Sequence, residues 1–244
     1  MSDPSTAPVA LVTGAARGIG VAICEALHHA GYDVVRADLL PRAGWEPATS
    51  VLDVDLDVRS LSSCREVIAE VEERFGRLDV LVNNAGVVAR GMALEVDDAL
   101  FTRILDVNLT GTFRMCQAAH GLLAADDGAA IVNIASTNGQ IAVPNTVAYC
   151  VSKAGVIHLT RVLALEWAGD GIRVNAVGPT IVPTDMTADV RADAHYMDDK
   201  LASIPLGRMA EPGDVADTVS YLASAAAGMI TGQTVFVDGG ATIH

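Results

Sequence analysis

Seven short apolar runs are spaced along the chain, and longer segments with apolar residues at helical intervals separate most of them. We predict strands in these runs, at residues 9–13, 32–37, 49–58, 78–82, 129–135, 172–177 and 233–237. Near-continuous apolar runs are typical of parallel strands that helices cover on both faces. The pattern therefore predicts a doubly wound α/β domain with a parallel sheet of about seven strands.

The predicted helices occupy the segments between these runs, at residues 19–30, 60–75, 96–125, 147–167 and 212–223. Ser60 is a predicted N-cap, and Pro212 suits the first turn of its helix. The chain has no internal repeat and no composition change that marks a second domain. We therefore expect a disordered tail at residues 1–7 and one domain at residues 8–244.

A glycine-rich turn joins the first predicted strand to the first helix and reads Thr13-Gly14-Ala15-Ala16-Arg17-Gly18-Ile19-Gly20. Glycines let the backbone approach a pyrophosphate, and free N–H groups at a helix N-terminus attract its negative charge. A strand, a glycine turn and a helix in this order favour a nucleotide site over an ordinary turn. The predicted dinucleotide contacts are Gly14, Arg17, Gly18, Ile19 and Gly20.

Asp38 ends the second predicted strand, eighteen residues beyond Gly20. An acidic residue near this position binds the hydroxyls of the adenosine ribose. Its charge would repel a 2′-phosphate, so Asp38 favours NAD over NADP. Arg17 and Arg42 leave phosphate binding open, and an aspartate at a strand end is also a common turn former.

Tyr149 and Lys153 are four residues apart and share one face of the predicted helix at residues 147–167. An ammonium beside a phenol lowers the tyrosine pKa from about 10, which makes Tyr149 a candidate acid/base. Ser136 ends a predicted strand and is placed to hydrogen-bond the reacting oxygen. A Tyr-x-x-x-Lys pair alone is common on helix surfaces, and the serine thirteen residues before the tyrosine favours catalysis.

The Ser-x12-Tyr-x3-Lys spacing resembles the catalytic signature of the short-chain dehydrogenase/reductase family. The glycine turn, spaced G-x-x-x-G-x-G, and Asn83-Asn84-Ala85-Gly86 after the fourth predicted strand resemble family motifs too. The resemblance covers nearly the whole chain. It implies a Rossmann-type fold, a nicotinamide cofactor and the catalytic residues Asn108, Ser136, Tyr149 and Lys153.

The resemblance also implies roles for residues that would be unremarkable alone. Lys153 is implied to bind the nicotinamide ribose as well, and Asn108 to hold a water that links Lys153 to solvent. The implied cofactor contacts are Asp57 and Val58 beside the adenine, Asn84, Ala85 and Gly86 after the fourth strand, and Val182 and Thr184 near the carboxamide and a phosphate.

One motif departs from the family pattern, because Pro179-Thr180 stands where the family usually has Pro-Gly. This variant and Ile204-Pro205-Leu206-Gly207-Arg208 resemble the L-xylulose reductase branch, which points to a sugar-like substrate. Residues 187–203 are polar and irregular, and they match the mobile segment that covers substrates in this family.

Composition narrows the class of partner. The 244 residues carry a formal net charge of −14, which argues against nucleic acid or an anionic membrane as a partner. The N-terminus has no signal-peptide pattern, and no apolar run is expected to span a bilayer. The four cysteines have no metal-ligand spacing, so we expect reduced thiols in a cytoplasmic protein without a metal.

These inferences predict an NAD(H)-dependent oxidoreductase that interconverts a secondary alcohol and a ketone. Asn138 and Asn145 flank the catalytic serine and tyrosine, and they favour a polyol or ketose as substrate. A 3-oxoacyl-thioester reductase is the alternative, and a non-catalytic NAD-binding sensor or scaffold is an alternative of another class. We also expect a homotetramer that buries apolar helix residues between subunits, although these residues could instead belong to the core: Leu109, Phe113, Cys116, Ile157, Val162 and Leu165.

Overall fold

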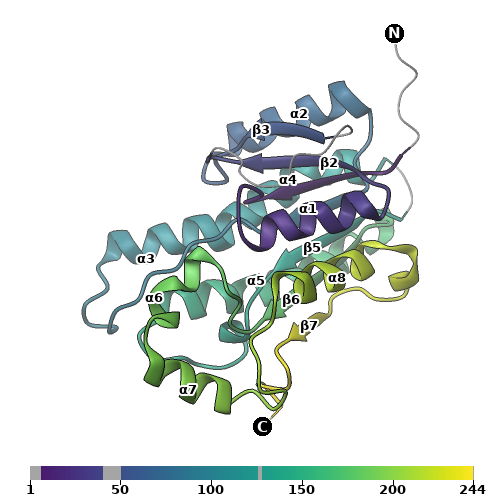
Figure 1. Ribbon diagram of the computed structural model, residues 1–244. Helices are drawn as coiled ribbons and strands as arrows, with labels where there is room; N and C mark the ends of the chain where they lie inside the picture. Colours follow the sequence, from purple (N-terminus) through teal and green to yellow (C-terminus); the bar gives the residue numbers. More distant parts are fainter. Residues whose placement is uncertain (1–6, 41–50, 126–127, 244) are drawn as a thin grey trace.

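The computed structural model describes residues 7–40, 51–125 and 128–243 (Figure 1). Most of the tail predicted for residues 1–7 lies outside these ranges, and so does Arg42. A single sheet organises the described residues, with helices on both of its faces. The doubly wound, Rossmann-type fold predicted from the sequence is confirmed.

All strand pairs in this seven-stranded sheet are parallel, in the order β3-β2-β1-β4-β5-β6-β7. Leu11 at the centre of β1 pairs with Val35 on one side and Leu81 on the other. The strands are β1 (Val9–Thr13), β2 (Asp33–Asp38), β3 (Val51–Asp55), β4 (Val80–Asn83), β5 (Ala130–Ile134), β6 (Arg173–Pro179) and β7 (Thr234–Val237).

Two hydrophobic layers form because alternate strand residues point to opposite faces of the sheet. Leu11 packs with α2 (Leu61–Phe75), α4 (Gly111–Leu123) and α5 (Val147–Glu166), whereas the adjacent Val12 packs with α1 (Ile19–His29) and α8 (Pro212–Ala223). Both residues are completely buried. Burial on two sides explains why the strands appear in the sequence as uninterrupted apolar runs.

The segment predicted as one or two helices at residues 96–125 contains three consecutive helical pieces. They are α3 (Asp98–Leu105), a π-helical turn (Asp106–Thr110) and α4. Such single π turns are rare and occur often at functional sites. Here the turn carries Asn108, whose side chain is completely buried.

The prediction of an irregular segment at residues 187–203 is wrong, because this segment forms α6 (Ala188–Arg191) and α7 (Ala194–Ala202). Asp193 caps α7, and its side chain accepts a hydrogen bond from the backbone N–H of Tyr196. Neither helix has a buried residue, so neither carries the apolar periodicity that marks a core helix. The two helices lie together below the sheet, beside the C-terminus (Figure 1).

The order of the strands reverses between β1 and β4, and this reversal opens a crevice at their carboxyl ends. The loops after β1, β2, β4, β5 and β6 all end there, so residues far apart in sequence meet. The helix α5 brings Tyr149 and Lys153 to the same place. By length and composition alone α5 is apolar enough to cross a membrane, unlike our expectation, but it packs on the sheet as a core helix.

Candidate active site

The glycine turn borders a cavity of about 390 Å³ at the N-terminus of α1. Gly14 and Gly18 have φ values of 65° and 58°, in the region that favours glycine. Among the residues that the structure describes, no side chain caps α1, so its first N–H groups have no capping acceptor there. These N–H groups can donate hydrogen bonds to the oxygens of a pyrophosphate. The turn therefore fits a dinucleotide.

The turn after β4 is packed against the glycine turn. A Cβ atom on Gly14 would lie 2.8 Å from the Cα atom of Ala85. Asn84 donates from Nδ2 to the carbonyl oxygens of Thr13 and Gly14 at 3.0 and 2.8 Å. Asn84, Ala85 and Gly86 all border the cavity, and the amide of Asn84 holds the shape of the glycine turn.

Asp38 borders the same cavity at the end of β2. Its Oδ2 atom accepts from the backbone N–H of Ala16 at 2.9 Å, and its Oδ1 atom accepts from that of Leu40 at 3.0 Å. The carboxylate thus ties β2 to the glycine turn while it faces the cavity. Arg17, which we considered as a phosphate ligand, lies 3.4 Å from the carboxylate of Asp185.

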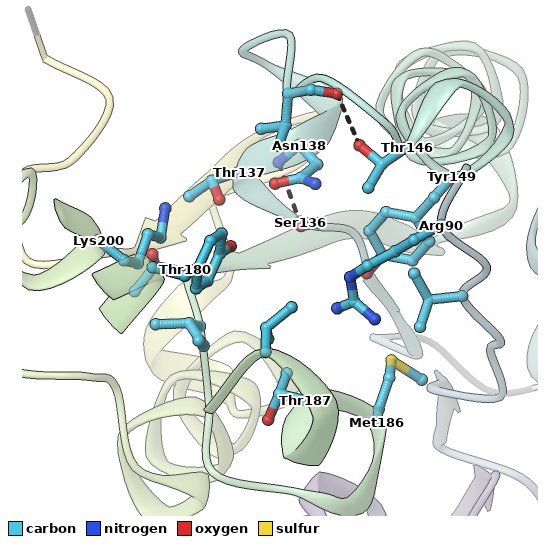
Figure 2. A pocket seen from close by; sticks show the side chains of 15 residues that line it. Arg90, Ser136, Thr137, Asn138, Thr146, Tyr149, Thr180, Met186, Thr187 and Lys200 are labelled. Carbon is cyan, nitrogen blue, oxygen red and sulfur yellow. Dashed lines mark hydrogen bonds between the residues drawn. The ribbon is translucent and has the colours of Figure 1, made fainter. Parts of the chain in front are cut away.

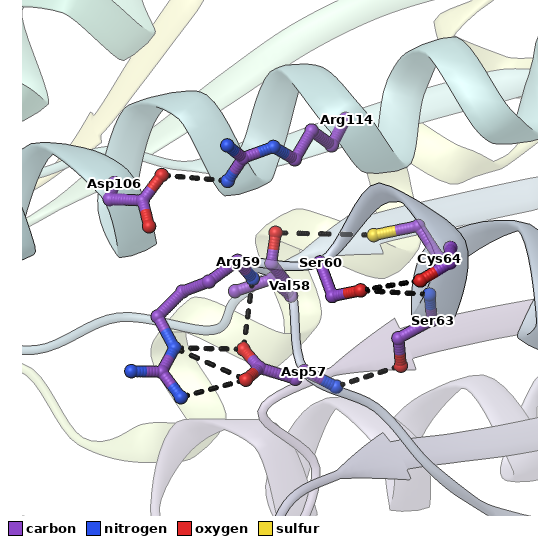
Figure 3. Close-up of polar contacts among 9 residues, drawn as sticks. Asp57, Val58, Arg59, Ser60, Ser63, Cys64, Asp106 and Arg114 are labelled. Atoms are coloured by element: carbon purple, nitrogen blue, oxygen red, sulfur yellow. Dashed lines mark hydrogen bonds and ion pairs between the residues drawn. The ribbon is translucent and has the colours of Figure 1, made fainter.

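Asp57 and Val58 border the cavity together with Arg59, which the sequence analysis missed. Figure 3 shows the contacts between Arg59 and the carboxylate of Asp57. The Arg59 guanidinium donates hydrogen bonds to both carboxylate oxygens of Asp57. These bonds keep the pKa of Asp57 below its ordinary value. Val58 packs against Gly111, where an added Cβ would lie 2.8 Å from Val58 Cγ2. The ion pair with Asp57 thus compensates the positive charge of Arg59 within the chain.

Ser136, Tyr149 and Lys153 meet at the ends of β5 and α5, as the sequence spacing predicts. Ser136 and Tyr149 border both a smaller pocket of about 110 Å³ and a second pocket that also contains Lys153. The Lys153 ammonium lies 5.8 Å from the centre of the Tyr149 ring and donates to the carbonyl oxygen of Ile134 at 2.6 Å. A hydroxyl, a phenol and an ammonium thus converge on one place.

The expected direction of the Tyr149 pKa is wrong. Burial raises this pKa above 10, and a hydrogen bond with Ser136 lowers it only in part. Burial also lowers the pKa of Lys153 to about 8, because the apolar surroundings disfavour its charge. The Lys153 ammonium lies over the Tyr149 ring but donates its hydrogen bond to the carbonyl oxygen of Ile134. No hydrogen bond between this ammonium and the phenol oxygen therefore lowers the Tyr149 pKa.

Asn108 is fixed by its own hydrogen bonds inside the π-helical turn. Its Oδ1 atom accepts from Val87 N at 2.8 Å, and its Nδ2 atom donates to Val87 O at 2.9 Å and to Ser152 Oγ at 3.0 Å. These bonds join the turn after β4 to the helix that carries Tyr149 and Lys153. The side chain therefore positions both elements of the site.

A pocket with several polar side chains, here called the polar pocket, adjoins Ser136 and Tyr149 (Figure 2), and its lining also includes the apolar Val88, Val143, Ile181, Met186 and Val190. Asn138 borders it as predicted, and its backbone N–H donates to Ser136 Oγ at 3.1 Å. Asn145 is exposed, with a φ of 61°, and it is not among the residues that border the pocket. Thr180, from the motif that departs from the family pattern, borders it too. The sequence analysis missed further polar residues of its lining, among them Arg90, Thr146, Thr187 and Lys200.

The three cavities form a continuous series along the carboxyl ends of the strands. Thr184 and Met186 border both the large cavity and the pocket of Lys153, and Thr180 joins that pocket to the polar one. Val182 is buried and borders the middle pocket. A dinucleotide in the large cavity would thus extend one end towards Tyr149.

Comparisons with known proteins agree with this arrangement. The protein family described as Enoyl-(Acyl carrier protein) reductase matches residues 14–242. A D-threitol dehydrogenase from Mycolicibacterium smegmatis is 41% identical, over 96% of this chain and 93% of its own length. An NAD-dependent glycerol dehydrogenase from Listeria innocua is 36% identical, over 98% of this chain and 95% of its own.

A 3-oxoacyl-[acyl-carrier-protein] reductase from Staphylococcus aureus is 37% identical, over 95% of this chain and 96% of its own length. Among solved structures, a gluconate 5-dehydrogenase from Burkholderia cenocepacia in complex with NADP and tartrate aligns with a TM-score of 0.91. It is 31% identical and the alignment covers 97% of this chain and 96% of that one. The L-xylulose reductase branch is not singled out by these matches. With its sheet, glycine turn and Ser-Tyr-Lys site, the chain belongs to the short-chain dehydrogenase/reductase family of oxidoreductases that act on CH–OH groups.

Proposed function

We propose that this protein is a cytoplasmic, NAD(H)-dependent enzyme that interconverts a secondary alcohol and a ketone of the polyol and ketose class. The observation that carries the proposal is the polar pocket beside Ser136 and Tyr149, which contains Arg90, Asn138 and Lys200. These three side chains can form hydrogen bonds with the hydroxyl groups of a polyol, which an aliphatic chain lacks. Relatives that are dehydrogenases of threitol and glycerol support the same class.

In the proposed mechanism Tyr149 moves the proton of the reacting oxygen, and Ser136 orients that oxygen through a hydrogen bond. The bound nicotinamide would supply or accept the hydride. Because burial raises the pKa of Tyr149, the phenol holds its proton at neutral pH and can act as an acid in ketone reduction. In alcohol oxidation the positive charge of Lys153 favours loss of the phenol proton.

The cofactor residues proposed here follow the large cavity. The glycine turn and the uncapped start of α1 would hold the pyrophosphate, and Asp38 would accept hydrogen bonds from the adenosine ribose. Arg17 and Arg59 border the cavity too, but carboxylates of Asp185 and Asp57 engage both. The negative charge of Asp38 would repel the 2′-phosphate of NADP, and the two paired arginines compensate this repulsion less than free ones would. The site therefore favours NAD over NADP.

A 3-oxoacyl-thioester reductase is the second candidate, and the relative from Staphylococcus aureus favours it. An acyl chain could contact the apolar side chains of the pocket, but it would offer no hydrogen-bond partner to the buried Thr180 hydroxyl. In addition, an acyl-carrier protein is acidic, and this chain has a net charge of −14, so docking would need a local basic patch.

The proposed function is tested with a panel of polyols, ketoses and 3-oxoacyl thioesters, with NADH absorbance as the readout. We expect kcat/KM to be highest for a polyol or its ketose. Faster turnover of an acetoacetyl thioester than of any polyol or ketose would overturn the assignment. Turnover by the wild type and loss of turnover in Tyr149→Phe would show that the chain itself performs the reaction.

A further inference from the structure

Two cations border the polar pocket of a protein whose net charge is −14, and they lie on opposite sides (Figure 2). Arg90 lies on the side of Tyr149, and its guanidinium forms an ion pair of 2.6 Å with Asp189. Lys200 lies on the other side, at the end of α7. Among the described residues, no side chain forms a hydrogen bond or ion pair with its ammonium within bonding distance.

The carboxylate of Asp238 acts on Lys200 through its charge, but it is buried and already accepts three hydrogen bonds from other groups. Its Oδ1 atom accepts from Gly240 N at 3.0 Å, and its Oδ2 atom accepts from Thr242 N at 2.9 Å and from Thr242 Oγ1 at 2.7 Å. Asp238 raises the pKa of Lys200, while the larger effect of burial lowers it. A half-buried ammonium without a direct partner is stabilised when a ligand brings an anion.

Thr180 provides a second open group in the same pocket. Its hydroxyl is buried and has no hydrogen-bond partner among the described residues. A buried hydroxyl without a partner is costly, and a polar ligand removes this cost. Thr180 and Lys200 lie on the same side of the pocket, away from Arg90 (Figure 2). The threonine also stands where the resembling motif usually has a glycine without a side chain.

We propose that the substrate is a polyhydroxy acid whose carboxylate binds Lys200 and the Thr180 hydroxyl, while its secondary alcohol lies at Ser136 and Tyr149. This inference rests on the proposed function and narrows its substrate class from neutral polyols to sugar acids. In the oxidation, a bound oxidised nicotinamide would accept the hydride from the carbinol carbon, and the phenolate form of Tyr149 would accept the hydroxyl proton. The products are an oxo acid and the reduced cofactor.

The test compares acids and neutral polyols of equal length, D-threonate with D-threitol and D-gluconate with D-glucitol, at saturating NAD. Wild-type kcat/KM is expected to be at least about tenfold higher for an acid than for its neutral partner. Lys200→Gln should lower kcat/KM for the acid by about 10–100-fold, since a hydrogen bond to a charged group is lost. This loss should exceed the loss with the neutral polyol at least tenfold.

Two further variants separate charge and hydroxyl effects from misfolding. Lys200→Arg keeps the positive charge and should retain more activity with the acid than Lys200→Gln. Thr180→Val removes the hydroxyl at nearly constant volume and should lower kcat/KM for the acid about 3–10-fold more than Thr180→Ser. Arg65→Gln, on the exposed side of α2, makes the same change in net charge outside the site and serves as the control.

The outcomes distinguish this inference from the proposed function. If neutral polyols are oxidised as fast as the acids, or if Lys200→Gln lowers both equally, the sugar-acid inference is overturned and the polyol assignment stands. If neither acids nor neutral polyols reduce NAD, both are overturned. Equal losses of kcat/KM for the acid in Lys200→Gln and Arg65→Gln would overturn the sugar-acid inference alone, because the change in net charge would then explain the effect.

Discussion

At the scale of single residues, Tyr149 is the proposed proton-transfer group, and its surroundings set a clear expectation. Tyr149→Phe keeps the ring that packs in the site and removes the hydroxyl. We expect kcat to fall about 100-fold or more, because general acid–base groups typically contribute this much. NADH affinity, measured by fluorescence, should change little. A Tyr149→Phe enzyme that retains more than about a tenth of wild-type kcat would contradict the role.

The lowered pKa of Lys153 should make the unfolding free energy depend on pH. Its pKa is about 8 in the folded protein and near 10.5 when exposed, so between these values the unfolded chain binds more protons. Stability from this residue therefore rises with pH across the window from about 8 to 10.5 and is lowest below pH 8.

Lys153→Met removes this titration. As pH rises from 8 to 10, the unfolding free energy of the wild type should increase relative to that of Lys153→Met, by up to about 1.4 kcal/mol per pH unit. Urea unfolding at several pH values measures it. A difference that stays constant over this range would mean that the ammonium is not desolvated in the folded protein.

Asp38 should determine which cofactor is preferred. Asp38→Asn removes the negative charge and keeps an oxygen that can accept from Ala16 N, so it disturbs the glycine turn less than alanine would. The ratio of kcat/KM for NAD to that for NADP should fall at least tenfold. Asp217→Asn, which makes the same charge change on the exposed side of α8, should leave the ratio unchanged. A wild type that prefers NADP would refute the assignment.

Residues next to each other in sequence were easier to predict than residues that only the fold brings together. The spacing of Ser136, Tyr149 and Lys153 depends on one strand and one helix, so the sequence was sufficient. Arg90 and Lys200 come from two distant segments, and no local pattern marks them. The Tyr149 pKa depends on burial by the whole fold, which explains why its expected direction was wrong.

At the scale of elements, the helices α6 and α7 cover the polar pocket and are held by contacts at their edges. The ion pair between Arg90 and Asp189 joins α6 to the loop after β4. A small apolar cluster of Ile181, Ile204 and Ala241 packs with Val190 and Met197 on the inner side of the two helices. The sequence analysis missed these helices because polar side chains dominate them, although alanine and a capping aspartate favour their formation.

We expect the Arg90–Asp189 pair to help to hold this cover closed over the substrate. Asp189→Asn should raise KM a few-fold and change kcat less, because the pair is partly exposed and worth about 1 kcal/mol or less. The wild-type KM should approach that of the variant at high salt, which screens the pair. Steady-state kinetics at low and high salt measure both effects. A proportional loss of kcat at unchanged KM would contradict a role in closing the pocket.

At the scale of the whole molecule, the strand pattern was the most predictable feature. Burial on both faces of the sheet leaves uninterrupted apolar runs, and every predicted strand is present within a few residues. The expected subunit contact was harder to predict, since a helical pattern does not separate core residues from interface residues. Cys116 and Ile157, which we expected between subunits, are buried in the core of the monomer.

The remaining apolar residues on the outer sides of α4 and α5 still favour assembly. Phe113 and Val162 are 39% and 37% exposed, Val151 is 45% exposed, and Leu165 is 83% exposed. Scattered apolar residues are ordinary on a protein surface, but several of them on the outer sides of two helices that cover the same face of the sheet favour an interface. A symmetric assembly would bury the same residues from each copy. We therefore propose that the protein is a homotetramer in which these two helices pack against their copies.

Leu165→Glu tests the assembly, because it places a charge at the most exposed of these positions. A buried glutamate opposite its own copy would be desolvated and repelled, so the contact should break. Sedimentation at micromolar concentration should give a tetramer for the wild type and a smaller species for Leu165→Glu. Leu94→Glu makes the same substitution at a position that is 98% exposed and outside these two helices, and it provides the comparison. A monomeric wild type would refute the proposal, and a tetrameric Leu165→Glu would place the interface elsewhere.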